Sequence, residues 1–130
     1  MAEELAGKRI LLVDDDRDIL TAMEAALSDL GAEIYTAADG NAAITQADQH
    51  RPDLVVLDQM LPKRSGFLVM EKFRKVKEGA RRPRVIMITG NLGVRHKTYA
   101  QSLGVDCYLN KPFRMEKLVD EVKRLLGECR

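Results

Sequence analysis

The stretch ILLVDDD (residues 10–16) decides the fold, because four apolar residues in a row run directly into three aspartates. A continuous apolar run, unlike an alternating one, is typical of a strand that is buried on both faces, and such strands belong to parallel sheets covered by helices. Two further runs share this character, LVVLD (residues 54–58) and VIMIT (residues 85–89). The sequence therefore predicts a parallel sheet with polar side chains at the ends of its strands.

Amphipathic segments separate these runs and predict helices. Asp16 and Asp39 suit the N-cap position of two of them, Ser65 suits that of a third, and Gly31 is a natural stop. The predicted helices end before Gly31, run from Asp39 to Ala47, from Ser65 through Val76, from about Val94 to Leu103, and from Met115 to Leu126. Weaker strands are predicted at residues 34–36 and 107–109. This (βα)5 alternation predicts one α/β domain, with its core at about residues 8–126 and loose ends at residues 1–7 and 128–130.

Composition excludes several classes of protein. The chain has 130 residues, of which 45% are hydrophobic and 32% charged, so it suits one domain of ordinary size with its own core. No apolar run approaches the roughly 20 residues of a membrane helix, and no signal peptide is visible. Cys107 and Cys129 form no CxxC pair, and there are two histidines, which excludes a disulfide scaffold and a thiolate zinc site. We expect a cytoplasmic protein.

Charge is distributed unevenly along the chain. Residues 1–65 hold 6 Lys and Arg against 13 Asp and Glu, whereas residues 66–130 hold 15 against 7. A basic half can indicate nucleic-acid binding. Here the basic residues are spread out and are not interleaved with aromatic residues, so we favour solvated helix faces and an acidic cation site instead.

Polar residues follow the predicted strands. Residues 14–16 are all aspartate, and Asp58, Thr89 and Lys111 each stand at the end of a later strand. Open α/β sheets place their ligand crevice at this edge. Two carboxylates 4 Å apart repel by about 4 kcal/mol at an effective dielectric constant of 20, so the edge needs a compensating cation. Oxygen ligands without His or Cys select Mg²⁺ or Mn²⁺.

This set of groups suits phosphoryl transfer. An aspartate is a competent nucleophile in aspartyl-phosphate chemistry. The metal ion and Lys111 would neutralise the phosphoryl oxygens, and Thr89 would donate a hydrogen bond to one of them.

Five motifs in this order resemble one family. They are LLVDD (residues 11–15), LDQMLP (57–62), SG (65–66), MITG (87–90) and KPF (111–113). Together they resemble the receiver domain of two-component response regulators, of the single-domain chemotaxis type, over about residues 8–126. The resemblance implies a flavodoxin-like, doubly wound, three-layer αβα fold with strand order 2-1-3-4-5.

The resemblance also implies roles for individual residues. Asp58 matches the phosphoacceptor, which takes a phosphoryl group from a histidine kinase or a histidine phosphotransfer protein. Asp15 matches the direct Mg²⁺ ligand, Asp14 the acid that holds the ion, and the Met60 backbone carbonyl a further ligand beside Asp58.

A second group of residues matches the parts that respond to phosphorylation. Thr89 matches the switch hydroxyl, Tyr108 the aromatic that moves inward with it, and Lys111 the phosphate-contacting lysine, with a cis peptide bond to Pro112. The resemblance implies a signalling switch, not an enzyme acting on other substrates. Its output surface would be the fourth helix, fifth strand and fifth helix, which would contact a downstream protein target or effector domain, or a second copy in a homodimer. If the chain is complete, output is by contact with a partner.

Three alternatives bear on these assignments. The spacing of Asp14, Asp16 and Asp18 superficially opens a calcium loop, but the glycine expected next is Ile19. A haloacid-dehalogenase-like phosphatase would use Asp14 and Asp16 and leave Asp58 idle, whereas we interpret Asp16 as an N-cap. A degenerate receiver that binds without accepting phosphate is the third. Leu61, Ser65 and Met60 depart from the commonest receiver pattern but remove no reactive group.

Overall fold

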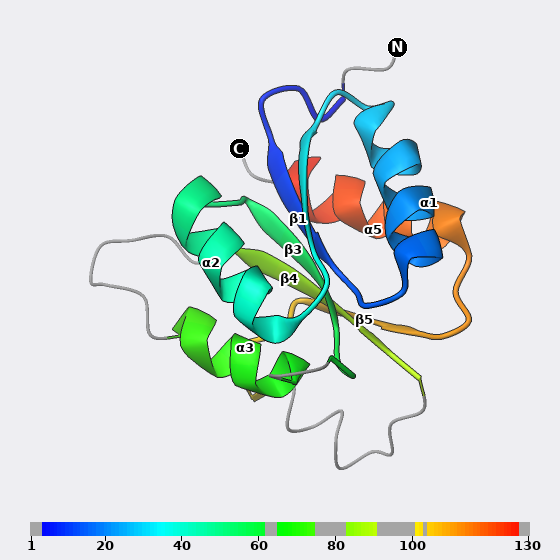
Figure 1. Ribbon diagram of the computed structural model, residues 1–130. Coiled ribbons are helices and arrows are strands. Elements are labelled where there is room, and N and C mark those ends of the chain that lie inside the picture. Colours follow the sequence, from blue (N-terminus) through cyan, green and yellow to red (C-terminus); the bar gives the residue numbers. More distant parts are fainter. Residues whose placement is uncertain (1–3, 62–64, 75–82, 91–100, 103, 128–130) are drawn as a thin grey trace.

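The computed structural model describes residues 4–61, 65–74, 83–90, 101–102 and 104–127. Strands and helices alternate along the chain as the sequence predicts (Figure 1). The elements are β1 (Arg9–Val13), α1 (Arg17–Ser28), β2 (Glu33–Ala37), α2 (Gly40–His50), β3 (Leu54–Asp58), α3 (Gly66–Arg74), β4 (Arg84–Thr89), β5 (Cys107–Asn110) and α5 (Met115–Gly127). The helix predicted from about Val94 to Leu103 lies almost entirely outside the described residues.

All five strands are parallel and lie in the order β2-β1-β3-β4-β5. The three strands predicted from continuous apolar runs, β1, β3 and β4, occupy the centre of the sheet, where both of their faces are covered. The weaker runs form the two edge strands, β2 and β5. The flavodoxin-like order implied by the resemblance is therefore confirmed.

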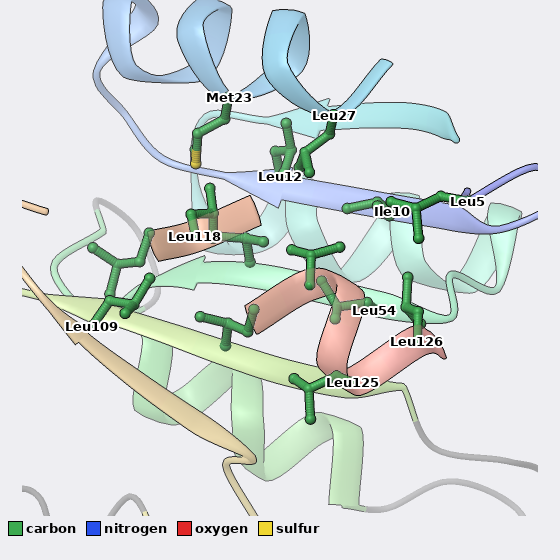
Figure 2. Packing of buried hydrophobic residues seen from close by; sticks show 14 residues of the cluster. Leu5, Ile10, Leu12, Met23, Leu27, Leu54, Leu109, Leu118, Leu125 and Leu126 are labelled. Carbon is green, nitrogen blue, oxygen red and sulfur yellow. The ribbon is translucent and has the colours of Figure 1, made fainter. Parts of the chain in front are cut away.

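Two hydrophobic clusters cover the two faces of the sheet. On one face, α1 and α5 pack over alternate strand residues such as Ile10, Leu12 and Leu54 (Figure 2). On the other, α2 and α3 pack over the intervening residues such as Leu11, Val55 and Met87. The layers are thus helices, sheet and helices, as Figure 1 shows.

Local capping explains where the helices begin. The Asp16 side chain accepts hydrogen bonds from the backbone N–H groups of Asp18 and Ile19 at the start of α1. Asp39 accepts one from Ala42 N at the start of α2. Ser65 Oγ accepts one from Leu68 N ahead of α3. All three predicted caps are confirmed, and Asp16 is the N-cap of α1, as predicted.

The prediction that residues 1–7 are a loose end is wrong for residues 4–7. Leu5 is buried in the same cluster as Ile10 and Leu126 (Figure 2). Its backbone N–H donates to the carbonyl of Leu30 over 2.8 Å, and Glu4 forms an ion pair with Lys123 of α5 at 3.2 Å. The cause is apolar burial by a single leucine, which draws the flanking turn onto the domain.

Candidate functional site

The carboxyl ends of β1 and β3 place three carboxylates together. Asp14 and Asp58 are buried, Asp15 is exposed, and one oxygen from each lies within 4.8 Å of the others. β1 and β3 are hydrogen-bonded neighbours, with Val13 opposite Leu57, so the residues that follow Val13 and Leu57 emerge at the same edge. The sequence-predicted convergence of Asp14, Asp15 and Asp58 is therefore present.

Backbone N–H groups orient the two buried carboxylates. Asp16 N donates to Asp14 Oδ1 over 2.9 Å, and Met60 N donates to Asp58 Oδ1 over 3.1 Å. In each case the Oδ1 atom is bound by the loop that carries it, and Oδ2 is left to face the cluster. Met60 itself is exposed.

Lys111 joins these two carboxylates. Its Nζ atom lies 3.3 Å from Asp58 Oδ2 and 3.3 Å from Asp14 Oδ2. Apart from this ion pair, the buried Asp14 Oδ2 has no hydrogen-bond partner in the described part of the chain. The peptide bond from Lys111 to Pro112 is cis, as the resemblance implies.

The charges in the cluster do not balance. Three carboxylates face one ammonium group, which leaves an excess of negative charge in a partly dry site. Burial raises the pKa of Asp58 to about 6, and the nearby Asp14 carboxylate adds to this, although the Met60 N–H and Lys111 act in the opposite direction. Burial of Lys111 lowers its pKa, but the carboxylates of Asp58 and Asp14 outweigh this, so that the pKa of Lys111 is raised overall.

A divalent cation fits this arrangement of groups. The donors are all carboxylate oxygens, which hard cations such as Mg²⁺ and Mn²⁺ prefer. The buried Asp14 Oδ2 lacks a hydrogen bond, and the excess negative charge would be neutralised. The fit rests on these donors and charges.

Thr89 and Tyr108 lie on one face of the sheet. In the β4–β5 register Thr89 is opposite Asn110 and Met87 is opposite Tyr108, so Tyr108 is on the neighbouring strand two positions before the level of Thr89. Thr89 is buried and its Oγ1 has no hydrogen-bond partner among the described residues. Tyr108 is half-buried and packs against the cluster on the α2 and α3 face, and burial raises its pKa.

Two features of the site were not predicted from the sequence. Gln59, directly after Asp58, is buried and its Oε1 has no hydrogen-bond partner among the described residues. Gly66 packs so closely on the end of β3 that an added Cβ would lie 2.6 Å from the Asp58 carbonyl oxygen. The Gln59 burial continues the parity of Leu57 and Val55, which are buried two and four positions earlier, whereas the glycine contact joins residues eight positions apart and leaves no local signal.

Comparison with known proteins identifies the family. The family model of the response regulator receiver domain matches residues 10–123. This chain is a receiver domain. The haloacid-dehalogenase-like alternative is therefore wrong, and the structure agrees with this by placing Asp58 inside the carboxylate cluster and using Asp16 as a cap.

Individual relatives of this receiver domain agree with the family. It is 38% identical over 123 residues to a probable transcriptional regulator, ycf27, of Cyanophora paradoxa, covering 95% of this chain and 50% of the relative. It is 37% identical over 120 residues to the alkaline phosphatase synthesis transcriptional regulatory protein PhoP of Bacillus subtilis, covering 92% of this chain and 49% of the relative. The chain thus spans about half the length of these curated relatives.

Among solved structures, a CheY-like response regulator receiver domain protein of Methanospirillum hungatei superposes with a TM-score of 0.85 at 30% identity. The match covers 93% of this receiver domain and 94% of that chain. Within the described residues, no helix combines the length and the hydrophobicity that crossing a membrane requires.

Proposed function

We propose that this receiver domain accepts a phosphoryl group on Asp58 in a Mg²⁺-dependent reaction and thereby controls a partner. The observation that carries the proposal is the setting of Asp58. It is buried at a strand end, with Lys111 Nζ at 3.3 Å and with Asp14 and Asp15 in the same cluster. A buried carboxylate between an ammonium group and an acidic cation site suits an acceptor better than a structural ion pair.

In the proposed step, an Asp58 carboxylate oxygen attacks the phosphorus of a phosphohistidine on a histidine kinase or phosphotransfer protein. An O–P bond forms, the N–P bond breaks, and the histidine nitrogen leaves with the bonding electron pair. Because its pKa is raised only to about 6, Asp58 is ionised and nucleophilic at neutral pH. Lys111, held beside Asp58 Oδ2, supplies positive charge to the incoming phosphoryl oxygens.

The metal ion would be held by Asp14, Asp15, Asp58 and the Met60 carbonyl. When bound, Mg²⁺ or Mn²⁺ neutralises phosphoryl charge and helps to orient the donor. Asp14 and Asp58 are pre-oriented for this by the backbone N–H groups that hold their Oδ1 atoms.

The switch that we propose runs from Thr89 to Tyr108. A hydrogen bond from the buried Thr89 hydroxyl to a phosphoryl oxygen would draw this side chain inward and free space on the sheet face that Tyr108 shares. The surface changed would include Tyr108–Lys111 and Arg114–Leu126, together with the predicted fourth helix outside the described residues. Its partner would be a downstream protein target, an effector domain or a second copy of this chain. We place the protein in the cytoplasm, and we do not propose that this domain binds nucleic acid.

The test is the intact mass before and after incubation with a small-molecule phosphodonor and Mg²⁺. The wild type should gain the mass of one phosphoryl group, and Asp58→Asn should gain nothing. Asp16→Asn is the matched control, because asparagine caps a helix as well as aspartate does, so this variant should be phosphorylated normally. A wild type that gains no mass would favour the degenerate receiver, which binds without accepting phosphate.

A further inference from the structure

Gln59 is held in place by its backbone, while its buried side chain is left without a partner. Its N–H donates to the Ile88 carbonyl over 2.8 Å, and its carbonyl accepts from Gly66 N over 3.0 Å. The residue is 9% exposed, and Oε1 has no hydrogen-bond partner among the described residues. A buried amide oxygen without a partner is costly, so its retention beside the acceptor calls for a physical reason.

The second buried oxygen without a partner lies next to it. In the β3–β4 register Asp58 is opposite Ile88, so the next residues, Gln59 and Thr89, lie side by side where the two strands end. Two positions earlier on the same strands, Leu57 is opposite Met87, and both pack in the cluster on the α2 and α3 face. Thr89 Oγ1 is buried and, like Gln59 Oε1, has no hydrogen-bond partner among the described residues.

The two groups are chemically complementary. A threonine hydroxyl carries one donor proton, and a glutamine Oε1 atom is an acceptor. Side-chain rotation alone can bring such neighbours together, and pairing would remove two buried unsatisfied atoms at once.

We infer that Gln59 is a positioning residue for the switch. In the structure neither oxygen has a partner among the described residues, and rotation of the two side chains lets the Thr89 hydroxyl donate its hydrogen bond to Gln59 Oε1 in the unphosphorylated protein. The hydroxyl has a single proton, so it cannot donate to Gln59 and to a phosphoryl oxygen at the same time. Phosphorylation therefore has to break the Gln59–Thr89 pair, and Gln59 stabilises the inactive state. This inference rests on the proposed function of Thr89.

The first test uses the protein without any phosphoryl group or analogue. Three-bond couplings from the Thr89 γ-methyl carbon to the backbone nitrogen and carbonyl carbon report its χ1 rotamer. The wild type should show one rotamer, and Gln59→Met, which keeps the length of the side chain but not its acceptor, should show averaging. Averaging already present in the wild type, or unchanged couplings in the variant, would overturn the inference.

The second test is a double-mutant cycle on the affinity for beryllofluoride, a phosphoryl analogue, in the presence of Mg²⁺. Gln59→Met should tighten binding about fivefold, because the competing hydrogen bond is gone. In a Thr89→Val background, which removes the hydroxyl at nearly constant volume, the same change should alter affinity less than about twofold. Equal effects in both backgrounds would show that Gln59 acts through packing, and Gln59→Leu repeats the comparison with another apolar side chain.

Failure of the inference is distinguishable from failure of the proposed function. If beryllofluoride does not bind the wild type, the proposed phosphorylation site is wrong, yet the Thr89 couplings still decide whether Gln59 holds the hydroxyl.

Discussion

Lys111 Nζ lies 3.3 Å from Asp58 Oδ2 and occupies the side of the carboxylate cluster where positive charge is needed. The same Nζ also contacts Asp14 Oδ2, so one ammonium group partly neutralises two proposed metal-binding carboxylates. A cation that enters the site therefore competes with Lys111 for electrostatic interaction with these two carboxylates.

Replacing Lys111 by methionine should consequently tighten Mg²⁺ binding severalfold, while the phosphodonor still labels Asp58 and the downstream response weakens. Asp15→Asn should act in the opposite direction and weaken Mg²⁺ binding about tenfold or more, because it removes a proposed ligand. Both constants come from titration of the metal-free protein. If Asp15→Asn leaves the titration unchanged, the assigned cation site is wrong.

The raised pKa of Asp58 predicts a particular dependence of stability on pH. The folded protein binds a proton at Asp58 up to about pH 6, whereas the unfolded chain releases it near its ordinary pKa of 3.8. Because the folded state binds more protons between these values, the Asp58 contribution to the free energy of unfolding falls as pH rises from about 4 through 6.

Asp58→Asn removes this contribution. Without Mg²⁺, the variant should be more stable than the wild type at pH 7.5 by up to about 3 kcal/mol, and the difference should shrink toward pH 4. Urea unfolding at several pH values measures it, and saturating Mg²⁺ should reverse the order at neutral pH. A stability difference that does not vary with pH would contradict the assignment.

Gly66 is predicted to be essential for packing α3 on the backbone of Asp58 and Gln59. A Cβ there would lie 2.6 Å from Asp58 O and 2.8 Å from Gln59 Cα, and both obstacles are backbone atoms. Gly66→Ala should lower the free energy of unfolding by about 2–3 kcal/mol. Gly127→Ala is the matched control, since nothing lies within 4 Å of its Cβ, and it should leave stability unchanged or slightly higher. Equal effects of the two changes would refute the close contact.

Much of this arrangement could be predicted from the sequence, because it depends on local chemistry. The apolar run that ends in Asp14 and the run that ends in Asp58 predicted central parallel strands, and strand ends in such a sheet meet at one edge. Asp16 and Asp39 predicted the starts of their helices, because an N-cap side chain binds N–H groups no more than three residues further along the chain.

The features that escaped prediction depend on contacts between distant segments. Leu5 stands alone as an apolar residue beside Glu3 and Glu4, so no periodicity marks its burial against Leu126. The need for glycine at position 66 arises from the backbone of Asp58, eight residues earlier.

The proposed switch predicts which residues change their environment on phosphorylation. With beryllofluoride and Mg²⁺, backbone amide shifts should change in Tyr108–Lys111 and Arg114–Leu126, whereas α2 (Gly40–His50) should remain unaffected. The coupling should be on the order of 1–3 kcal/mol. Shift changes confined to the loops around Asp58, with Tyr108 and α5 silent, would show that this chain does not use the route from Thr89 to Tyr108.

The most direct measurement identifies the residue that carries the phosphoryl group. The wild-type protein is phosphorylated with a small-molecule donor and Mg²⁺, its acyl phosphate is reduced with borohydride, and the peptides are sequenced by mass spectrometry. Reduction converts a phosphorylated aspartate, and no other, to homoserine. We predict homoserine at position 58 and aspartate at positions 14, 15 and 16. Homoserine at any of those three positions, with Asp58 unchanged, would contradict the account.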